Sequence, residues 1–384
     1  MADVAIVGGG IIGAACAHEM ARRGASVVLL ERQELAAGAS GRNQGWFILS
    51  ADPPCTPMSR ASLSVYLDVI ESSAVPVRFD RDPIGFLLTA TDEHAAFAAQ
   101  AMANAWAASG VTTEFLEGAA LREAEPALSP QVIAGWLLDQ GRRVDPGALT
   151  VALATSAREL GAVIRHHTNV RSLTHVGDRV TGVATDDGII AADIVILAAG
   201  PWSAPLVRPL GIDLPVTGAR GWIVELAAPP GLLHHLIEEV DGVPQEPERY
   251  PTAAELAGGA SPEPAVASIV HAATDGTVVC GASHHPVVRP EAEDPDAPSR
   301  IAARVIRLVP ALADLTVRGT RWGIRPMSPD GRPLVGRLAD GLFAATGHGP
   351  EGVLLGGGTA ALAGTLISGE EPPFDPAPFD PLRF

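Results

Sequence analysis

Residues 3–32, DVAIVGGGIIGAACAHEMARRGASVVLLER, decide the fold of this 384-residue chain. An apolar run rich in β-branched residues, 3–7, predicts a buried strand, and the alanine-rich stretch 11–23 predicts the helix that follows it. A second buried strand, 26–30, comes next and ends at Glu31. Three glycines in the spacing G-x-G-x-x-G join the first strand to the helix: Gly8, Gly10 and Gly13. This order of strand, glycine-rich turn, helix, strand and acidic residue is typical of a dinucleotide-binding βαβ unit.

The unit also predicts how a dinucleotide is bound. Gly8 permits a tight turn, Gly10 lets the backbone approach a pyrophosphate, and Gly13 brings the helix close to the strand, so that the helix N-terminus faces the phosphates. Glu31 can accept hydrogen bonds from the adenosine ribose and would repel a 2′-phosphate, which favours FAD or NAD over NADP. The alternative is a glycine-rich turn without function, because a chain with 41 glycines can contain this spacing by chance.

Composition excludes several classes of protein. The 384 residues are enough for two domains, and 47% hydrophobic with 18% charged residues describe a well-buried globular protein. A net charge of −17 makes nucleic acid and an anionic membrane surface poor partners. All 27 basic residues are arginine, which excludes a Schiff-base lysine, a P-loop lysine and a lysine general base.

The three cysteines, Cys16, Cys55 and Cys280, are far apart in the sequence. They indicate buried thiols in a reducing compartment, and we predict neither a disulfide nor a metal site. The chain enters its first strand directly, without a predicted signal peptide, so we expect a cytoplasmic protein, with peripheral contact to the inner membrane as the alternative. The longest apolar stretch, 352–367, is shorter than the about twenty residues of a membrane span. It therefore predicts a buried helix.

The rest of the chain predicts two kinds of sheet and an α/β fold class. Residues 194–199 are a second buried run that ends in glycine, which indicates another parallel strand that meets the cofactor. Residues 216–226 and 269–281 predict strands without intervening helices, as in an antiparallel sheet. Residues 241–268 have no periodicity, and we expect a long loop that serves as a lid or as a surface for a second copy or a partner subunit, or else a disordered insertion.

These patterns predict two domains. We expect the discontinuous cofactor-binding domain to comprise residues 1–80, 142–214 and 300–384. We expect the substrate-binding domain to comprise residues 81–141 and 215–299.

Two further glycine-rich stretches carry polar side chains or a helix N-terminus that can bind a ligand. Residues 36–45, AAGASGRNQG, predict a loop whose Ser40, Arg42 and Asn43 offer hydrogen bonds to phosphate or ribose, or else a solvated turn. Residues 346–356 predict a strand, a glycine-rich turn and a helix N-terminus, which together form a second site for negative charge.

Arg325 follows a predicted strand and precedes Pro326, which fixes the backbone there. A guanidinium so placed can hold a carboxylate through two parallel hydrogen bonds, and the alternative is an ordinary ion pair. The sequence resembles the D-amino-acid oxidase family of FAD-dependent amine oxidoreductases. The resemblance lies in the N-terminal unit, in residues 40–43, 198–202 and 347–349, and in the pair Arg325 and Pro326. That family includes glycine oxidase, sarcosine oxidase and bacterial D-amino-acid dehydrogenases, and the resemblance extends over almost the whole chain.

The resemblance implies a Rossmann-like FAD-binding domain and a substrate domain built on an antiparallel sheet. It implies that Arg325 holds the carboxylate of an amino acid whose α-carbon lies over the flavin N5. A hydride would pass from this carbon to N5 and the imine would hydrolyse, which is oxidative deamination or dealkylation of a D-amino acid, glycine, sarcosine or a cyclic or N-alkyl amino acid. The residues expected at FAD are Gly8, Gly10, Ile11, Ile12, Gly13, Glu31, Arg32, Ser40, Arg42, Asn43, Gln44, Gly45, Val170, Ala199, Gly200, Trp202, Gly347, His348, Gly349, Gly352, Val353 and Leu354.

The sequence differs from members of this family in three ways. Sarcosine oxidase-like members attach flavin through a cysteine and activate oxygen with a lysine, but this chain has no lysine and no cysteine near Gly347. We therefore expect non-covalent FAD, and we expect the reduced flavin to pass electrons faster to a quinone or dye than to oxygen. Where glycine oxidase-like members present a tyrosine to the substrate, this chain has His271 and His284. These two and His348 are candidates to shape the pocket or accept the amine proton. Each can equally be an ordinary core or surface histidine.

Three other functions fit the same motifs. An FAD-dependent 2-hydroxy-acid dehydrogenase would also use an arginine for the carboxylate. An NAD-dependent reductase would be colourless, whereas a flavoprotein is yellow. A flavin-bearing subunit of a hetero-oligomeric amine dehydrogenase would be inactive alone.

Overall fold

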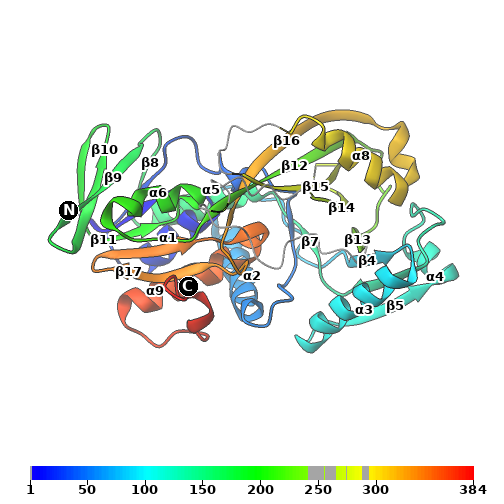
Figure 1. Cartoon of the computed structure of the whole chain (residues 1–384), viewed down its shortest axis with the longest axis horizontal. Helices are drawn as coiled ribbons and strands as arrows, with labels where there is room; N and C mark the ends of the chain where they lie inside the picture. Colours follow the sequence, from blue (N-terminus) through cyan, green and yellow to red (C-terminus); the bar gives the residue numbers. More distant parts are fainter. Residues whose placement is uncertain (1, 241–254, 256–264, 274, 288–293) are drawn as a thin grey trace.

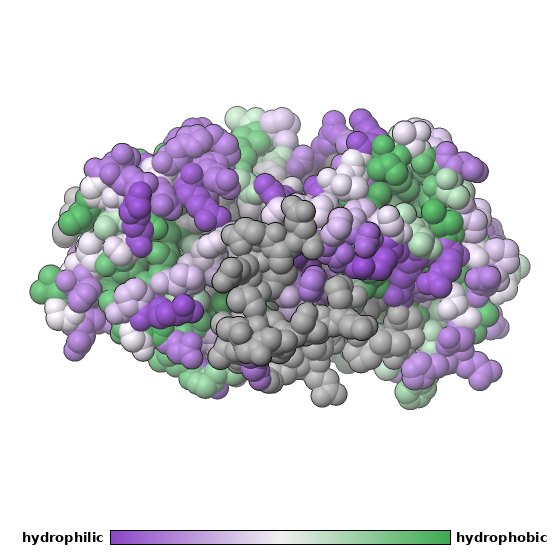
Figure 2. Space-filling model, turned by 45° about the horizontal axis from the view of Figure 1, so that its top comes forward, coloured by the Kyte–Doolittle hydropathy of each residue, from purple (hydrophilic) through white to green (hydrophobic). Residues whose placement is uncertain are grey.

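The computed structural model describes residues 2–240, 255, 265–273, 275–287 and 294–384. It shows an elongated molecule with two large β-sheets, one toward each end (Figure 1). The face drawn in Figure 2 is mostly hydrophilic, with hydrophobic residues in smaller groups. The apolar half of the composition therefore lies largely inside, packed between helices and sheets.

The first sheet has eight strands, and its centre is the predicted βαβ unit. β1, β2, β8, β11 and β18 run parallel, β17 pairs antiparallel with β18, and β9 and β10 extend β11 as antiparallel neighbours. The strands are β1 (Ala2–Val7), β2 (Val27–Leu30), β8 (Val163–Arg165), β9 (Val170–Val176), β10 (Arg179–Thr185), β11 (Gly188–Leu197), β17 (Leu334–Ala339) and β18 (Leu342–Thr346).

The helices lie where the sequence gives them ends. For example, the side chain of Asp145 caps α5 (Pro146–Glu159) by accepting a hydrogen bond from the Ala148 N–H at 2.9 Å, and Pro146 stands at the first helical position. The α-helices are α1 (Ile11–Arg22), α2 (Cys55–Ser72), α3 (Glu93–Ala108), α4 (Gly118–Ala124), α5 (Pro146–Glu159), α6 (Ser203–Val207), α8 (Ala297–Leu308) and α9 (Gly352–Ser368). Short 3-10 turns are η1 (Ala39–Gly41), η2 (Gly200–Trp202), η3 (Arg208–Leu210), η4 (Pro310–Asp314), η5 (Gly349–Glu351) and η6 (Ala377–Phe379).

The second sheet is also eight-stranded and mostly antiparallel, in the order β16-β12-β15-β14-β13-β4-β6-β5. Only its β13–β4 pair is parallel within the described chain. Its strands are β4 (Phe86–Ala90), β5 (Thr113–Glu117), β6 (Ala134–Leu138), β12 (Thr217–Ala227), β13 (Leu236–Val240), β14 (Ala265–Ala272), β15 (Thr277–Val287) and β16 (Thr316–Met327). A separate pair, β3 (Trp46–Phe47) and β7 (Arg142–Arg143), lies outside both sheets.

The sequence analysis did not predict β13 and the start of β14. β13 carries two glutamates, and Glu239 is buried because it accepts hydrogen bonds from Ser268 Oγ at 2.7 Å and Arg304 Nε at 3.0 Å. Such partners are invisible in a linear sequence, so a strand with buried charge resembles a loop. Residues 265–268 belong to β14, which corrects the end of the predicted 241–268 loop, and most of the remaining stretch lies outside the described residues.

The sheet to which each strand belongs suggests a different limit between the two predicted domains, but it does not determine that limit. β16 pairs with β12 along its length, and α8 packs on β14, β15 and β12. Assigning domains by sheet would therefore move residues 300–327 from the cofactor-binding unit to the second unit. The predicted division into 1–80, 142–214 and 300–384 against 81–141 and 215–299 stays a prediction.

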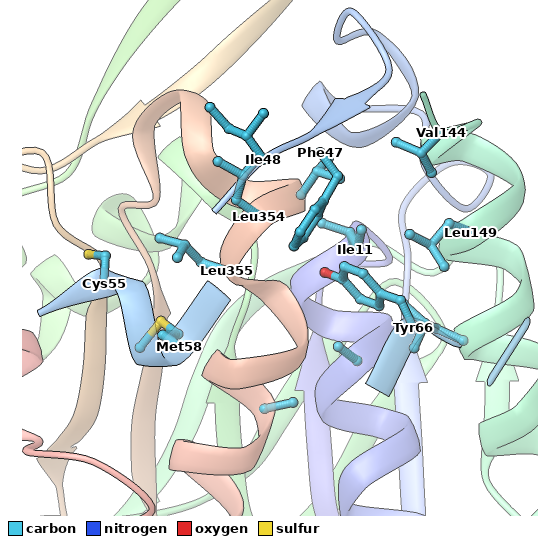
Figure 3. Close-up of a cluster of buried hydrophobic side chains, with 14 of the residues drawn as sticks. Ile11, Phe47, Ile48, Cys55, Met58, Tyr66, Val144, Leu149, Leu354 and Leu355 are labelled. Atoms are coloured by element: carbon cyan, nitrogen blue, oxygen red, sulfur yellow. The ribbon is translucent and has the colours of Figure 1, made fainter. Parts of the chain in front are cut away.

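α9 is a core helix, as its apolar sequence predicts. The segment Gly349–Ser368 is long and apolar enough to cross a membrane by length and composition, but 67% of its apolar window is buried in the protein. Glycines let it approach α2 closely, because a Cβ on Gly357 would lie 2.8 Å from the Ser62 Cα. Figure 3 shows the adjoining core, to which the helices α1, α2 and α9 contribute Ile11, Tyr66 and Leu355.

Candidate active site

A cavity of about 1290 Å³ lies between the two sheets. One part is at the carboxyl ends of β1, β2 and β11, which is where ligands bind in open parallel sheets. The other part is under the second sheet, whose β12, β13, β14, β15 and β16 all contribute lining residues. The cavity therefore has room for a ligand larger than the about 300–1,000 Å³ of a typical small-molecule site.

The glycine-rich turn packs as closely as the sequence predicts. Gly8 has φ +112°, and a Cβ there would lie 2.8 Å from the Ala198 carbonyl carbon on β11's continuation. A Cβ on Gly13 would overlap the Gly8 carbonyl oxygen, so only glycine lets α1 start this close to β1. The first N–H groups of α1 are thereby aimed at the cavity from the end of the strand.

Glu31 stands at the end of β2 and lines the cavity. Its two carboxylate oxygens accept hydrogen bonds from the Gly9 N–H at 2.7 Å and the Gln33 N–H at 2.8 Å. A carboxylate has about four acceptor positions, so two stay available for hydroxyl groups. The binding of an adenosine ribose by Glu31 stays a prediction. Beside it, the Arg32 guanidinium lies 4.0 Å from the centre of the Trp202 ring, and both line the cavity.

The loop 39–45 is held by hydrogen bonds of its own side chains. Ser40 Oγ accepts the Ile11 N–H at 2.9 Å and so caps α1, and Asn43 donates to Ser40 O at 2.7 Å while accepting from the Gly45 N–H at 2.9 Å. Gln44 Oε1 accepts from the Trp46 indole at 3.0 Å. These side chains line the cavity, and the hydrogen bonds described above hold the loop in shape. The binding of phosphate or ribose by Ser40 and Asn43 stays a prediction.

The same loop is tied to the second sheet. Arg321 on β16 donates to the Asn43 carbonyl at 2.8 Å, and Arg42 donates to the Trp322 carbonyl at 3.4 Å. His271 on β14 places Nε2 3.1 Å from the Gln44 carbonyl. The two parts of the cavity are thus joined through this loop.

His271 is not in the cavity, which corrects its prediction as a pocket residue. Its side chain is fully buried, and its Nδ1 and Nε2 face the carbonyl oxygens of Ala272 and Gln44. Burial lowers its pKa to about 4, so at neutral pH the ring is uncharged and donates one proton only. We therefore assign His271 to holding the loop and the sheet together.

The other two predicted histidines do line the cavity. Burial, and then the charge of Arg325, lowers the pKa of His284 to about 3, and burial lowers the pKa of His348 to about 3. His348 Nε2 is 2.9 Å from Thr359 Oγ1. Both imidazoles are therefore neutral at pH 7.

Stability should fall as the pH is lowered from about 6.5 to about 4. In this window the unfolded chain, with ordinary histidine pKa values near 6.5, binds protons that the three buried histidines of the folded chain exclude, so stability rises with pH. Three protons correspond to a slope of about 4 kcal/mol per pH unit at most. Denaturation of the FAD-saturated protein at several pH values measures it.

The variant His271→Gln measures how much one of the three histidines contributes to the pH dependence of stability, since glutamine keeps an N–H donor but does not titrate. Its slope should be smaller than the wild-type slope by about 1.4 kcal/mol per pH unit. His175→Gln, at an exposed position, is the matched control and should keep the wild-type slope. Equal slopes for all three proteins would show that His271 titrates alike in both states.

Arg325 is placed on the cavity face of β16, opposite Ala219 of β12. Its Nη1 donates to the Ser283 carbonyl at 3.0 Å, and its guanidinium lies against the backbone of Gly221. His284 lines the same part of the cavity. Two of the three predicted catalytic candidates are therefore brought together under the second sheet, at the opposite side of the cavity from the glycine-rich turn.

Most of the residues predicted at FAD line the cavity, and three do not. Gly13, Gly45 and Gly347 lie behind the lining, and the last two have φ of +81° and +76° because they form turns. The predicted residues that line the cavity are Gly8, Gly10, Ile11, Ile12, Glu31, Arg32, Ser40, Arg42, Asn43, Gln44, Val170, Ala199, Gly200, Trp202, His348, Gly349, Gly352, Val353 and Leu354.

The remaining wall of the cavity was not predicted from the sequence. Along β12, β13 and β14 its residues alternate, which is the pattern of one face of a sheet, whereas β15 contributes consecutive residues at its irregular stretch. Recognising β13 and β14 as strands would have found them. They include Gly221, Ile223, Glu238, Val240, Ala265, Ala267, Ile269, Ala282 and Ser283, with Ala98, Met102 and Trp106 from α3.

The residues present fit FAD. The cavity is long enough to reach from Glu31 at one sheet to Arg325 at the other, and it passes the N-termini of α1 and α9. His348 Nδ1 is buried without a hydrogen-bond partner among the described residues, as expected of an atom that awaits a ligand. Glycine-rich turns at both helix starts leave the backbone open to phosphates and rings.

Comparison with known proteins identifies the family. The family model described as FAD-dependent oxidoreductase (DAO) matches residues 3–366. The chain is 30% identical to glycine oxidase from Pseudomonas aeruginosa, over 98% of each chain. It is 29% identical to 4-methylaminobutanoate oxidase (formaldehyde-forming) from Paenarthrobacter nicotinovorans, over 99% of this chain and 45% of that one. Glycine oxidase from Geobacillus kaustophilus has a similar crystal structure, with a TM-score of 0.86 and 26% identity over 100% and 99% of the two chains. The chain therefore belongs to the DAO family of FAD-dependent oxidoreductases, and FAD is its cofactor.

Proposed function

We propose that this enzyme oxidises an amino acid or N-alkyl amino acid at its carbon–nitrogen bond, and that Arg325 holds the substrate carboxylate. The observation that carries the proposal is the placement of Arg325: its guanidinium lines the cavity and is fixed by the Ser283 carbonyl at 3.0 Å. The relatives named for glycine and 4-methylaminobutanoate oxidation support the same reaction type.

The residues contribute position and an uncharged surrounding. The bond to Ser283 fixes the direction of the Arg325 guanidinium, whose planar fork of N–H groups matches a carboxylate and would hold one end of the substrate. His284 is neutral at pH 7 and lines the same part of the cavity, so it adds no positive charge beside the substrate amine, which must be neutral before it is oxidised. FAD, when bound, accepts the electron pair from the carbon next to nitrogen. Water then hydrolyses the imine product.

The test is anaerobic mixing of the purified holoenzyme with single substrates, followed by flavin absorbance. Glycine, sarcosine, D- and L-amino acids should include at least one that bleaches the flavin, with release of ammonia or amine. Bleaching by 2-hydroxy acids alone would contradict the proposal and identify a hydroxy-acid dehydrogenase. An inactive chain that gains activity in a larger complex would identify a subunit of an amine dehydrogenase.

FAD should be bound without a covalent bond. All three cysteines are buried away from the cavity lining, and burial raises the pKa of the Cys16 and Cys280 thiols to about 12, so neither forms a reactive thiolate at pH 7. Acid precipitation should therefore release nearly all of the flavin into the supernatant. A yellow pellet after repeated washing would show attachment through another side chain.

Several parts of the proposed function rest on the sequence alone. Faster reoxidation by a quinone or dye than by oxygen follows from the absence of lysine. A cytoplasmic location, and a role for 241–268 in binding a second copy or a partner subunit, stay predictions. The choice of D- or L-amino acid belongs to the substrate screen.

A further inference from the structure

We propose that Gly221 is a positioning residue for Arg325, and that it acts together with an irregularity in β15 to aim the guanidinium at the substrate carboxylate. The inference rests on the proposed function of Arg325 as the carboxylate clamp. It concerns three neighbouring strands of the second sheet, β16, β12 and β15, which present Arg325, Gly221 and Ser283 to the cavity.

The first observation is a break in the pairing of β12 with β15. Between the pairs Arg220–His285 and Ile223–Gly281, β12 advances three residues while β15 advances four. β15 thus carries one extra residue at this point, which is a β-bulge. Bulges redirect side chains and carbonyls away from the regular ladder, and they are frequent beside active sites.

The bulge changes which groups pair with which. The Trp222 N–H of β12 donates to the Ser283 side-chain oxygen at 3.0 Å instead of to a backbone carbonyl of β15. The Ser283 carbonyl accepts from Arg325 Nη1, also at 3.0 Å, across the intervening strand. An arginine on β16 is therefore held by a carbonyl two strands away, which fixes the direction of its side chain over β12.

The second observation is the space that this crossing needs. Gly221 lies on β12 directly opposite Gly323, two residues from the row of Arg325, and its side-chain position is filled by the guanidinium. A Cβ on Gly221 would lie 2.6 Å from the Arg325 Cζ. Any larger residue must push the flexible end of Arg325 away from this track, while the backbone itself has room to stay. Glycine is thus needed at position 221 because of the orientation of Arg325, and the conformation of β12 itself does not require it.

The experiment compares Gly221→Ala with Gly319→Ala. Gly319 is on β16, where an added Cβ would have its nearest neighbour, Glu225, at 3.9 Å, so this control makes the same chemical change without touching Arg325. For each holoenzyme, kcat/KM is measured for the best amino acid and for the amine that lacks its carboxylate. Gly221→Ala should lower kcat/KM for the amino acid by about 10²-fold, as expected for a displaced positioning group, and leave the amine nearly unchanged. Gly319→Ala should leave both unchanged.

The ratio of kcat/KM for the amino acid to kcat/KM for the amine separates a loss of positioning from general damage to the protein. A structural defect would lower both rates, lower the melting temperature or change the flavin spectrum, and that result would overturn the proposal. Unchanged selectivity in Gly221→Ala would overturn it as well. The dissociation constant for propionate, read from the flavin spectrum, gives the same comparison without turnover and should rise in Gly221→Ala only.

A double variant shows whether Gly221 acts through Arg325. If it does, Gly221→Ala combined with Arg325→Ala should be no worse than Arg325→Ala alone. Losses that multiply would show independent effects and overturn the proposal. If Arg325→Ala itself keeps full selectivity for the carboxylate, then the clamp assignment fails. A selective loss in Arg325→Ala without one in Gly221→Ala shows that the clamp stands and the positioning inference fails.

Discussion

Gly10→Val protein should purify colourless. Gly10 is the residue before α1, with extended φ and ψ of −77° and 179°, and it lines the cavity. A Cβ there would lie 3.0 Å from Ser40 Oγ, which accepts the Ile11 N–H. Valine adds two methyl groups beyond that Cβ, so it would block the helix N-terminus and disturb its cap.

The size of the effect follows from the bonds that would be lost. Hydrogen bonds to a charged group contribute about 1.5–3 kcal/mol each. Loss of two bonds to the pyrophosphate would weaken FAD binding by about 10²–10⁴-fold. The ratio of flavin to protein absorbance after purification and a titration with added FAD measure this. Gly319→Val, the same change on a strand of the second sheet, should keep the colour, and a yellow Gly10→Val protein would refute the assignment of this turn to FAD.

Arg325→Ala should lower kcat/KM for the best amino acid by two orders of magnitude or more. Truncating one partner of a hydrogen-bonded charge pair costs about 2–5 kcal/mol, and here the lost bonds also orient the carbon that is oxidised. Arg325→Lys should recover only part of the activity, since an ammonium has no planar fork to match a carboxylate. Both variants should keep the flavin spectrum, because the fixed bond of Arg325 is to Ser283 in the second sheet.

Anaerobic flavin reduction followed over a range of substrate concentrations checks this prediction. It separates binding from the chemical step, so the lost carboxylate contact should appear as weaker binding and slower reduction together. Gly319→Ala again serves as a control for a change on the same strand. Near-normal reduction of Arg325→Ala by its best amino acid would mean that another residue holds the carboxylate.

Local sequence predicted the N-terminal unit well because its causes are local. Gly8 and Gly13 are required by contacts within the first fourteen residues and one neighbouring strand, and the buried strands are continuous apolar runs. Asp145 and Pro146 likewise define a helix start by themselves. Such features can be predicted from a sequence without knowledge of the residues that contact them from distant segments.

The site was harder to predict because its polar groups are shared between distant segments. Asn43 and Ser40 have the right chemistry for phosphate, yet their hydrogen bonds go to the loop and to α1. Glu239 is buried only because Ser268 and Arg304 meet it from elsewhere in the chain. Whether a donor faces a ligand or a carbonyl depends on tertiary packing, and a single sequence does not encode that in its spacing.

The ties between the 39–45 loop and the second sheet make the protein unequally tolerant of mutation at their two ends. Two of these ties end on the main-chain carbonyls of Asn43 and Gln44, which every amino acid supplies, and their partners on the sheet are the side chains of Arg321 and His271. The third runs the other way, from the Arg42 side chain to the Trp322 carbonyl. Substitutions at a carbonyl end leave the acceptor in place, whereas a change of Arg321, His271 or Arg42 removes one tie, so sequence drift is limited at these three side chains and open at their partners.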